Sequence, residues 1–353
     1  MRSVSVGVIG AGGRAKSHCE ALSLLDDCTV AAVCDLSESR AESLADQYGV
    51  EKTFTDYERM LAEVDFDAVY VVTPPSYMDP IVTNVLSAGT HLFVEKPPGI
   101  HAGQTKAWAQ LAEENDCITT VGFQRRFHPL LREARRRIEA KSSVLYSSAS
   151  FHKHNPETPV EQLTEWMESA DDDVGSLQVA NWLLLDIIHA IDLLVSVGGD
   201  VSDVSSLSGQ LYADEANFDP THMNLYTATL EFQNGGVGKL TSNRVAGGRK
   251  FSFELHGEGI SAYGEIPGTP GVDTLVMQRE GQAYAEADRI TTDDLDVDGE
   301  EIYQDGTHQI NEHFLDCIRG AETPEVRLRD TVESMEIVSE VLHGDRFPSV
   351  FTG

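Results

Sequence analysis

A short run of residues near the start of the chain has the composition of a phosphate-binding turn. The segment Gly10-Ala11-Gly12-Gly13-Arg14-Ala15 follows the apolar stretch Val4–Ile9 and precedes a helical pattern. Glycines between a strand and a helix let the backbone approach a pyrophosphate, and the helix N-terminus offers N–H groups to its oxygens. The pattern predicts a dinucleotide site. Its expected turn residues are Gly10, Gly12, Gly13 and Arg14.

A carboxylate stands where such a site would bind a ribose. Asp35 ends the second apolar run, Thr29–Cys34, about 20 residues after the turn. It can accept hydrogen bonds from the ribose 2′- and 3′-hydroxyls and would repel a 2′-phosphate, which favours NAD over NADP. The alternative is a loop carboxylate or a helix N-cap. Because Ser37 and Arg40 follow closely, NADP stays open as a cofactor.

A lysine followed by a proline stands at another predicted strand end. Lys96 follows the apolar run His91–Val94 and Glu95, and Pro97 comes next. Ligands of parallel α/β sheets bind at the carboxyl ends of the strands, so the lysine cation can hold a substrate oxygen there. The alternative is a surface lysine paired with Glu95.

Three ionisable residues interrupt a segment that is apolar nearly all round. Asp186, His189 and Asp192 lie within Asn181–Val197, which has the pattern of a buried helix. Burying such groups costs free energy unless partners compensate them. Asp186 and His189 are three residues apart, close to one helical face. They are either a functional pair or a core histidine with a structural aspartate.

The first 123 residues alternate short apolar runs with helical patterns, which is typical of βαβ units around a parallel sheet. This predicts a doubly wound α/β domain over residues 1–123. The expected strands are Val4–Ile9, Thr29–Cys34, Ala68–Val72, His91–Val94 and Ile118–Val121, with helices near residues 14–25, 37–47, 77–88 and 101–115.

Residues 124–353 are expected to form a second, α+β domain with a large mixed, mostly antiparallel sheet. Strands rich in Ser, Thr, Tyr and Phe alternate there, and Asn234-Gly235-Gly236 reads as a hairpin turn. The region 264–305 has no clear pattern. The expected strands are Val144–Phe151, Thr227–Phe232, Gly236–Ser242 and Lys250–Gly257, with closing helices at 308–319 and 328–343.

The chain is strongly acidic. It has 58 Asp and Glu against 26 Lys and Arg, a formal net charge of −32. Such a field repels nucleic acid and anionic membrane surfaces. It favours a protein adapted to high salt, and the alternative is an unusually acidic mesophilic protein. The five scattered cysteines indicate neither a disulfide framework nor a zinc site, no metal site is expected, and the first residues lack a secretory pattern, so we expect a cytoplasmic protein.

Four segments together resemble the glucose-fructose oxidoreductase, inositol dehydrogenase and MocA family. The first is Glu95-Lys96-Pro97, which matches the family's strand-end signature. The others resemble its cofactor-lining loop, its crossover into the second domain and its late helix, so the resemblance covers nearly the whole chain. These segments are Val71–Pro75, Val121–Phe127 and Asn311–Arg319.

The resemblance implies a Rossmann domain that binds NAD(P), and a second domain that supports dimers or tetramers. It implies a hydride transfer between nicotinamide and a sugar, polyol or related hydroxy compound. Lys96 would then stabilise the alkoxide, and His189, in a match to the family's H-x-x-D, would take the proton. Further cofactor contacts are expected from Thr73, Pro74, Glu95, Lys96 and Gln124.

The chain departs from the family pattern in two places. The aspartate before His189 is Asp186, three residues away rather than four, and Met78 stands where many members carry a histidine. His152 and His154 either line the substrate site or are strand-face residues. Two other functions stay open: an NAD-assisted glycosidase or eliminase without net redox change, and a non-catalytic nucleotide-sensing regulator.

Overall fold

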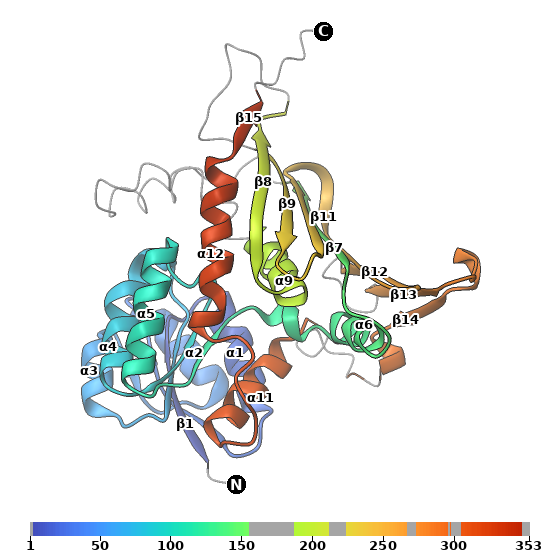
Figure 1. The fold of residues 1–353 in the computed structure, drawn as a ribbon. Helices are drawn as coiled ribbons and strands as arrows, with labels where there is room; N and C mark the ends of the chain where they lie inside the picture. Colours follow the sequence, from blue (N-terminus) through green and yellow to red (C-terminus); the bar gives the residue numbers. More distant parts are fainter. Residues whose placement is uncertain are drawn as a thin grey trace. The chain divides into compact units, whose positions relative to one another are not determined.

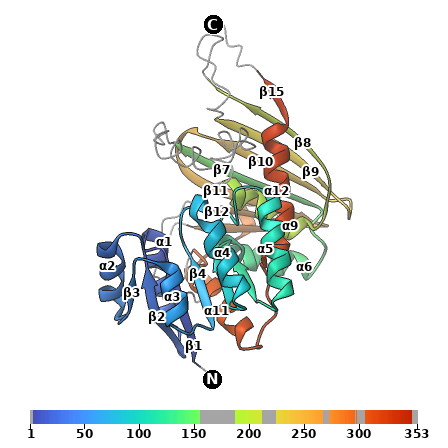
Figure 2. The same ribbon diagram turned by 90° about the vertical axis from the view of Figure 1, so that its left-hand side faces the viewer.

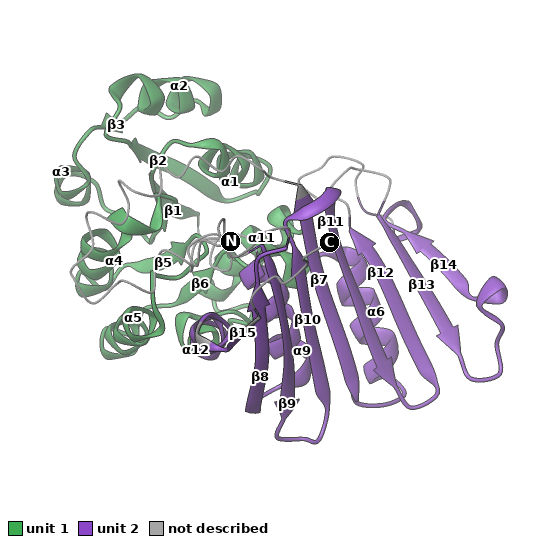
Figure 3. Ribbon diagram, turned by 90° about the horizontal axis from the view of Figure 1, so that it is seen from above, with its two compact units in different colours: residues 1–127, 305–332 green, residues 128–304, 333–353 purple. Residues whose placement is uncertain are grey.

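The computed structural model describes residues 3–154, 187–211, 224–266, 273–295, 297 and 305–347. The chain divides into two compact units, shown in different colours in Figure 3. Unit 1 contains Met1–Phe127 and Asp305–Val332, and unit 2 contains His128–Gln304 and Glu333–Gly353.

Unit 1 includes a late segment that the sequence pattern predicts to be part of the second domain. The predicted boundary after residue 123 lies close to the observed one after Phe127, but Asp305–Val332 belongs to unit 1. The physical reason is packing and hydrogen bonding over a long sequence separation. Helix α11 (Thr307–Ile318) packs on helix α1 (Gly13–Ser23), and the N–H of Val121 donates to the carbonyl of Val326 at 2.9 Å.

The sheet of unit 1 is parallel, which confirms the predicted doubly wound domain. Its six described strands follow the order β3-β2-β1-β4-β5-β6, and every neighbouring pair is parallel. The order reverses between β1 and β4, where dinucleotides bind in such sheets. The strands are β1 Val4–Ile9, β2 Cys28–Cys34, β3 Thr53–Phe54, β4 Ala68–Val71, β5 His91–Val94 and β6 Thr119–Val121.

Helices cover both faces of this sheet. Helices α1 and α2 lie on one face, and α4 and α5 lie side by side on the other (Figures 2 and 3). All four residues of β4 are buried because both of its faces are covered. Besides α1 and α11, the helices are α2 Glu38–Tyr48, α3 Tyr57–Glu63, α4 Met78–Ser87 and α5 Ala102–Glu114, with 3₁₀ turns at Pro75–Tyr77 and Gln124–Phe127.

Unit 2 has the predicted mixed, mostly antiparallel sheet. Its described strands follow the order β14-β13-β12-β11-β7-β10-β9-β8-β15, in which only β7–β10 and β8–β15 are parallel pairs. The strands are β7 Tyr146–His154, β8 Val201–Gly209, β9 Leu225–Phe232, β10 Val237–Asn243, β11 Val245–Gly257, β12 Ile260–Ile266, β13 Thr274–Arg279, β14 Asp288–Thr291 and β15 Asp345–Phe347.

The core of unit 2 follows the alternation of its strands. In β9 every second residue from Tyr226 to Phe232 is buried, and those between are half-buried or exposed. Helix α9 packs on β7 and β10, and α6 packs on β11 and β12 (Figures 1 and 3). The helices of this unit are α6 Pro129–Glu139, α9 Ile188–Gly198 and the second part of α12 Leu328–His343, with 3₁₀ turns at Tyr284–Glu286 and Asp293–Leu295.

The predicted hairpin at Asn234–Gly236 is confirmed. It joins the antiparallel strands β9 and β10, Gly235 has φ +84°, and the N–H of Gly236 donates to Oδ1 of Asn234 at 2.8 Å. Within the described ranges, no helix is both long enough and apolar enough to span a bilayer.

Candidate active site

The glycine-rich turn leads from β1 into α1 and leaves open space along its backbone. Gly10 has φ +100°, and a Cβ there would lie 2.4 Å from the carbonyl oxygen of Val72, so only glycine fits. In contrast, a Cβ at Gly12 or Gly13 would meet no described heavy atom within 4 Å. Gly12 caps the helix without a side-chain hydrogen bond. The turn therefore presents free N–H groups to a space that a ligand can fill.

Three residues predicted to contact the cofactor carry buried polar atoms without a hydrogen-bond partner among the described residues. These atoms are Nη2 of Arg14, Oγ1 of Thr73 and Oε1 of Gln124. The residues follow β1, β4 and β6, so they belong to the carboxyl edge of one parallel sheet. Buried polar groups in proteins are normally hydrogen-bonded. Together with the open turn, these residues fit a polar dinucleotide.

Asp35 follows β2 at the same edge, and its carboxylate contacts the glycine-rich turn. Oδ2 accepts a hydrogen bond from the N–H of Ala11 at 2.8 Å, and Oδ1 accepts one from Ser37 N–H at 2.8 Å. Arg40 donates to Oδ1 at 3.0 Å and 2.7 Å through Nε and Nη2. Burial alone would raise the pKa of Asp35, but these hydrogen bonds outweigh it and lower the pKa. The carboxylate is held ionised beside the turn.

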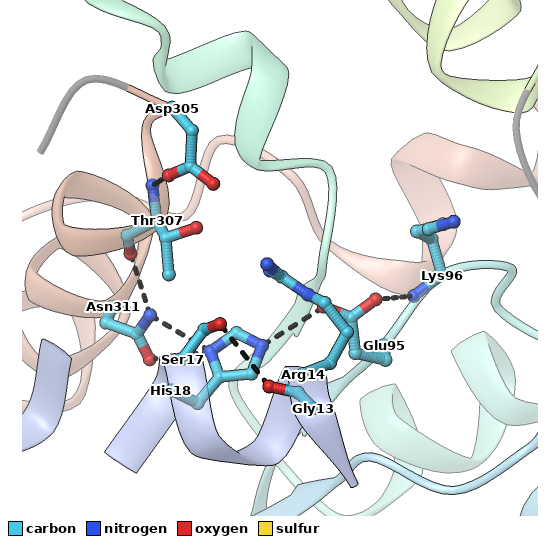
Figure 4. A network of polar contacts seen from close by, with 9 residues as sticks. All are labelled: Gly13, Arg14, Ser17, His18, Glu95, Lys96, Asp305, Thr307 and Asn311. Carbon is cyan, nitrogen blue, oxygen red and sulfur yellow. Dashed lines mark hydrogen bonds and ion pairs between the residues drawn. The ribbon is translucent and has the colours of Figure 1, made fainter. Parts of the chain in front are cut away.

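Glu95 and Lys96 follow β5 at the carboxyl edge of the sheet, beside helix α1 (Figure 4). Oε1 of Glu95 accepts hydrogen bonds of 3.1 Å from Nε of Arg14 and from Nε2 of His18, and Oε2 accepts one of 3.0 Å from the N–H of Lys96. Burial would raise the pKa of Glu95, but Arg14, His18 and Lys96 together lower it to about 2. A buried carboxylate therefore stays ionised next to the candidate catalytic lysine.

The sequence patterns did not indicate two residues of this cluster as site residues. His18 in α1 and Asn311 in α11 are fully buried and hydrogen-bonded to each other through Nδ1 of the imidazole. His18 shares the buried face of α1 with Ala15, Cys19 and Leu22. A histidine on an otherwise apolar helix face was the available signal, and its partners could not be inferred from spacing.

The residues predicted on the second-domain helix belong to unit 2. His189 and Asp192 are buried on α9, 5% and 2% exposed, among apolar neighbours. Asp186 lies outside the described residues, so its role stays a prediction. His152 on β7 is half-buried, its Nδ1 is buried without a described partner, and burial and Lys250 lower its pKa.

Among the described residues there is no group of three or more His, Cys, Asp or Glu side chains that could hold a metal ion. Met78, which stands at the position of the family's histidine, is fully buried at the start of α4.

Family models match most of the chain. The model described as an oxidoreductase family with an NAD-binding Rossmann fold matches residues 4–123, and the model of the family's C-terminal alpha/beta domain matches residues 160–343. The family is the one expected from the Glu-Lys-Pro signature, and its model confirms NAD as the cofactor.

Individual relatives match over nearly their full length. The inositol 2-dehydrogenase of Rhizobium meliloti is 32% identical over 298 residues, covering 80% of this chain and 86% of that protein. The scyllo-inositol 2-dehydrogenase (NAD(+)) of Bacillus subtilis is 24% identical over 340 residues, covering 95% and 92%. A dehydrogenase structure from Chromobacterium violaceum has the same fold, with a TM-score of 0.80 at 19% identity over 98% of this chain and 96% of that one. This chain therefore belongs to the glucose-fructose oxidoreductase, inositol dehydrogenase and MocA family of NAD-binding oxidoreductases.

Proposed function

We propose that the protein is an NAD-dependent dehydrogenase that oxidises a hydroxyl group of a cyclic polyol or a sugar. One observation carries the proposal. Lys96 lies two residues after the end of β5, in the unit that holds the open glycine-rich turn, and its main-chain N–H donates a hydrogen bond to the buried, ionised Glu95. A cation at the carboxyl edge of such a sheet suits the stabilisation of a reacting oxygen.

The proposed roles of the residues follow from the chemistry of the oxidation. Lys96 donates a hydrogen bond to the reacting hydroxyl and stabilises the negative charge that develops on its oxygen. His189 accepts the hydroxyl proton as general base. The nicotinamide of bound NAD would be the acceptor of the hydride from the carbon that bears this hydroxyl. The carbinol thus loses one proton and one hydride and becomes a carbonyl, and the reverse reduction uses the same groups.

The cofactor residues proposed here are those at the carboxyl edge of the unit 1 sheet. Gly12 and Gly13 offer N–H groups to the pyrophosphate, and Asp35 accepts hydrogen bonds from the hydroxyls of the adenosine ribose. The remaining contacts are assigned to Gly10, Arg14, Thr73, Pro74, Glu95, Lys96 and Gln124.

The relatives guide the choice of substrates for the test. Two of them are named inositol dehydrogenases, so inositols come first in a panel that also contains aldoses, sugar acids and nucleotide sugars. Absorbance at 340 nm is followed with NAD and with NADP at low and at molar salt, with Lys96→Ala as control. NADH formation by the wild type and not by Lys96→Ala supports the proposal. Turnover without any change at 340 nm would replace it with an NAD-assisted elimination or hydrolysis.

We also propose that the chain forms a homodimer or homotetramer through the outer face of the unit 2 sheet. That face carries half-buried residues such as Tyr146, Thr227 and Tyr263, whereas the other face packs on α6 and α9. Light scattering tests this at low and molar salt. A monomer mass under both conditions would contradict it.

A further inference from the structure

A single buried carboxylate connects the start of α1 with the end of β5. Glu95 is 4% exposed, and its two oxygens accept hydrogen bonds from Arg14, His18 and the main-chain N–H of Lys96. The glycine at position 122 leaves space for the carboxyl group of Glu95, because a Cβ at Gly122 would lie 2.9 Å from Cδ of Glu95. Burying a charge is costly unless it is paired and hydrogen-bonded, and Glu95 meets both conditions through residues of the dinucleotide-binding unit.

The amide of Asn311 holds the Nδ1 side of the His18 imidazole. Nδ2 of Asn311 donates to the carbonyl oxygen of Thr307 at 2.7 Å, which identifies this atom as the amide nitrogen because a carbonyl can only accept. The same Nδ2 lies 3.0 Å from Nδ1 of His18. Nδ1 also lies 3.2 Å from Oδ1 of Asn311. Nε2 lies 3.1 Å from Oε1 of Glu95 and donates to it, because a carboxylate can only accept. The imidazole thus donates to the carboxylate through Nε2 and contacts the amide of Asn311 through Nδ1.

These contacts form a continuous chain of side chains across three elements (Figure 4). It runs from Thr307 and Asn311 in α11, through His18 in α1, to Glu95 after β5. Arg14 joins it from the first turn of α1, at the turn that faces the dinucleotide space. The last hydrogen bond of this series is the one from the N–H of Lys96 to Glu95. It holds the main chain of this lysine relative to the glycine-rich turn.

We infer that Glu95 and His18 are positioning residues for Lys96: the buried chain Arg14–Glu95–His18–Asn311 holds the lysine at one place and orientation beside the dinucleotide turn. The inference rests on the proposed function, in which Lys96 contacts the reacting hydroxyl. Neither Glu95 nor His18 needs to touch substrate for this role. Small displacements of a group that contacts the reacting atoms slow the reaction. Disturbing the position of Lys96 should therefore lower kcat more than it weakens cofactor binding.

The charge of Glu95 gives the inference a consequence that a purely structural role lacks. Lys96 is among the groups that lower the pKa of Glu95 to about 2, after the effects of burial, Arg14 and His18. Attraction between two charges is mutual, so the carboxylate also favours the ammonium form of the lysine. Replacing Glu95 by the similarly shaped but uncharged Gln should therefore change the ionisation of Lys96. A substitution that only loosens packing elsewhere in the protein should not.

The test compares four variants of the full-length protein. Glu95→Gln keeps an acceptor for the Lys96 N–H and removes the charge. His18→Leu removes the donor to Glu95, and His18→Gln restores a donor at a similar reach. His128→Leu is the matched control, because His128 is also buried and hydrogen-bonded to a carboxylate, Asp273 at 3.0 Å, but belongs to unit 2, whereas Lys96 belongs to unit 1.

Three readouts are taken from each variant. The rate of Lys96 acylation by acetic anhydride, measured on its peptide by mass spectrometry between pH 6 and 11, needs no substrate. NADH binding is measured by fluorescence. The constants kcat and KM are measured with the substrate that the absorbance assay at 340 nm identifies. Circular dichroism shows which variants are folded.

We expect Glu95→Gln to move the midpoint of Lys96 acylation to lower pH, because an opposite charge nearby is removed. We expect kcat to fall about 10- to 100-fold in Glu95→Gln and His18→Leu. In His18→Leu the Kd of NADH should stay within about threefold of wild type, because His18 is not among the proposed cofactor contacts. His18→Gln should recover most of the kcat lost in His18→Leu, and His128→Leu should change stability without moving the acylation midpoint.

The inference is overturned when folded Glu95→Gln keeps the wild-type acylation midpoint, or when His128→Leu moves it equally. If His18→Leu does not fold, the same decision is made with His18→Gln and Glu95→Gln. If the wild type oxidises no compound of the panel, the proposed function fails, and the acylation profile still decides whether Glu95 governs Lys96.

Discussion

The carboxylate of Asp35 accepts a hydrogen bond of 2.8 Å from the main-chain N–H of Ala11, in the middle of the glycine-rich turn. The residue expected to select the cofactor ribose thus also supports the loop expected to bind the pyrophosphate. Its other oxygen is shared by Ser37 and Arg40. Selection of the cofactor and the shape of the turn are therefore coupled through one side chain.

Two substitutions at Asp35 should separate these roles. Asp35→Asn keeps an acceptor for Ala11 and removes the charge, so we expect the preference for NAD over NADP to narrow or reverse with little loss of total binding. Asp35→Ala also removes the acceptor and should weaken both cofactors about tenfold, the effect of one hydrogen bond to a charged group. Ratios of kcat/KM and the Kd of each cofactor measure this. A wild type that prefers NADP would contradict the assignment.

Lys96→Ala should lower kcat on the true substrate by about 10²-fold or more, because the developing negative charge on the substrate oxygen loses its stabilising cation. The Kd of NADH should stay close to that of the wild type. Steady-state kinetics and fluorescence titration measure the two quantities. Lys106→Ala, on α5 of the same unit, is the control for loss of a lysine. A Lys96→Ala enzyme within about threefold of wild-type kcat would show that the lysine is not catalytic.

His189→Ala should lose general-base assistance, typically 10²- to 10⁴-fold in kcat, and the ionisation near neutral pH should disappear from its kcat/KM profile. Asp186→Asn is compared with it to decide the role of the aspartate three residues earlier. A comparable loss would place Asp186 in the active site, and a kcat near wild type would make it structural. Retention of the neutral-pH ionisation in folded His189→Ala would exclude His189 as the base.

The dependence of stability on pH should identify the buried carboxylate. Glu95 has its pKa lowered from 4.5 to about 2, so its ionised form stabilises the fold fully above pH 4.5, and this contribution is lost as pH falls toward 2. The difference in free energy of unfolding between wild type and Glu95→Gln should shrink over that range. Urea denaturation at several pH values measures it. Glu139→Gln, from an exposed pair with Arg135, is the control, and a difference that does not vary with pH would contradict the assignment.

The net charge of −32 should make stability depend on salt. Because salt screens repulsion between like charges, we expect the Tm to rise as KCl increases from about 0.1 M to about 2 M, where the Debye length is only a few Å. Differential scanning calorimetry measures this, with sorbitol of equal osmolarity as an uncharged control. A flat or falling Tm would count against adaptation to salt.

Local patterns were enough to predict the parts of the site that depend on neighbours in sequence. The turn at Gly10–Ala15 and the position of Lys96 after a strand follow from apolar runs bounded by Gly and Pro, because backbone conformation there depends on adjacent residues. The edge strand β3, Thr53–Phe54, is only two residues long and has no periodicity, so it was not predicted. The parallel sheet and the hairpin at Gly235 were predicted for the same local reasons.

The partners of those residues depended on the tertiary structure. His18 and Glu95 are 77 residues apart, and His18 and Asn311 are 293 apart, so no spacing rule relates them. Asn311 reaches His18 because α11 returns to pack on α1, and this packing also places Asp305–Val332 in the first unit. The sequence alone indicated which residues could take part in chemistry and where strands end. Only the folded chain decided that a buried carboxylate is ionised beside Lys96, because burial and its compensating donors come from segments far apart in the chain.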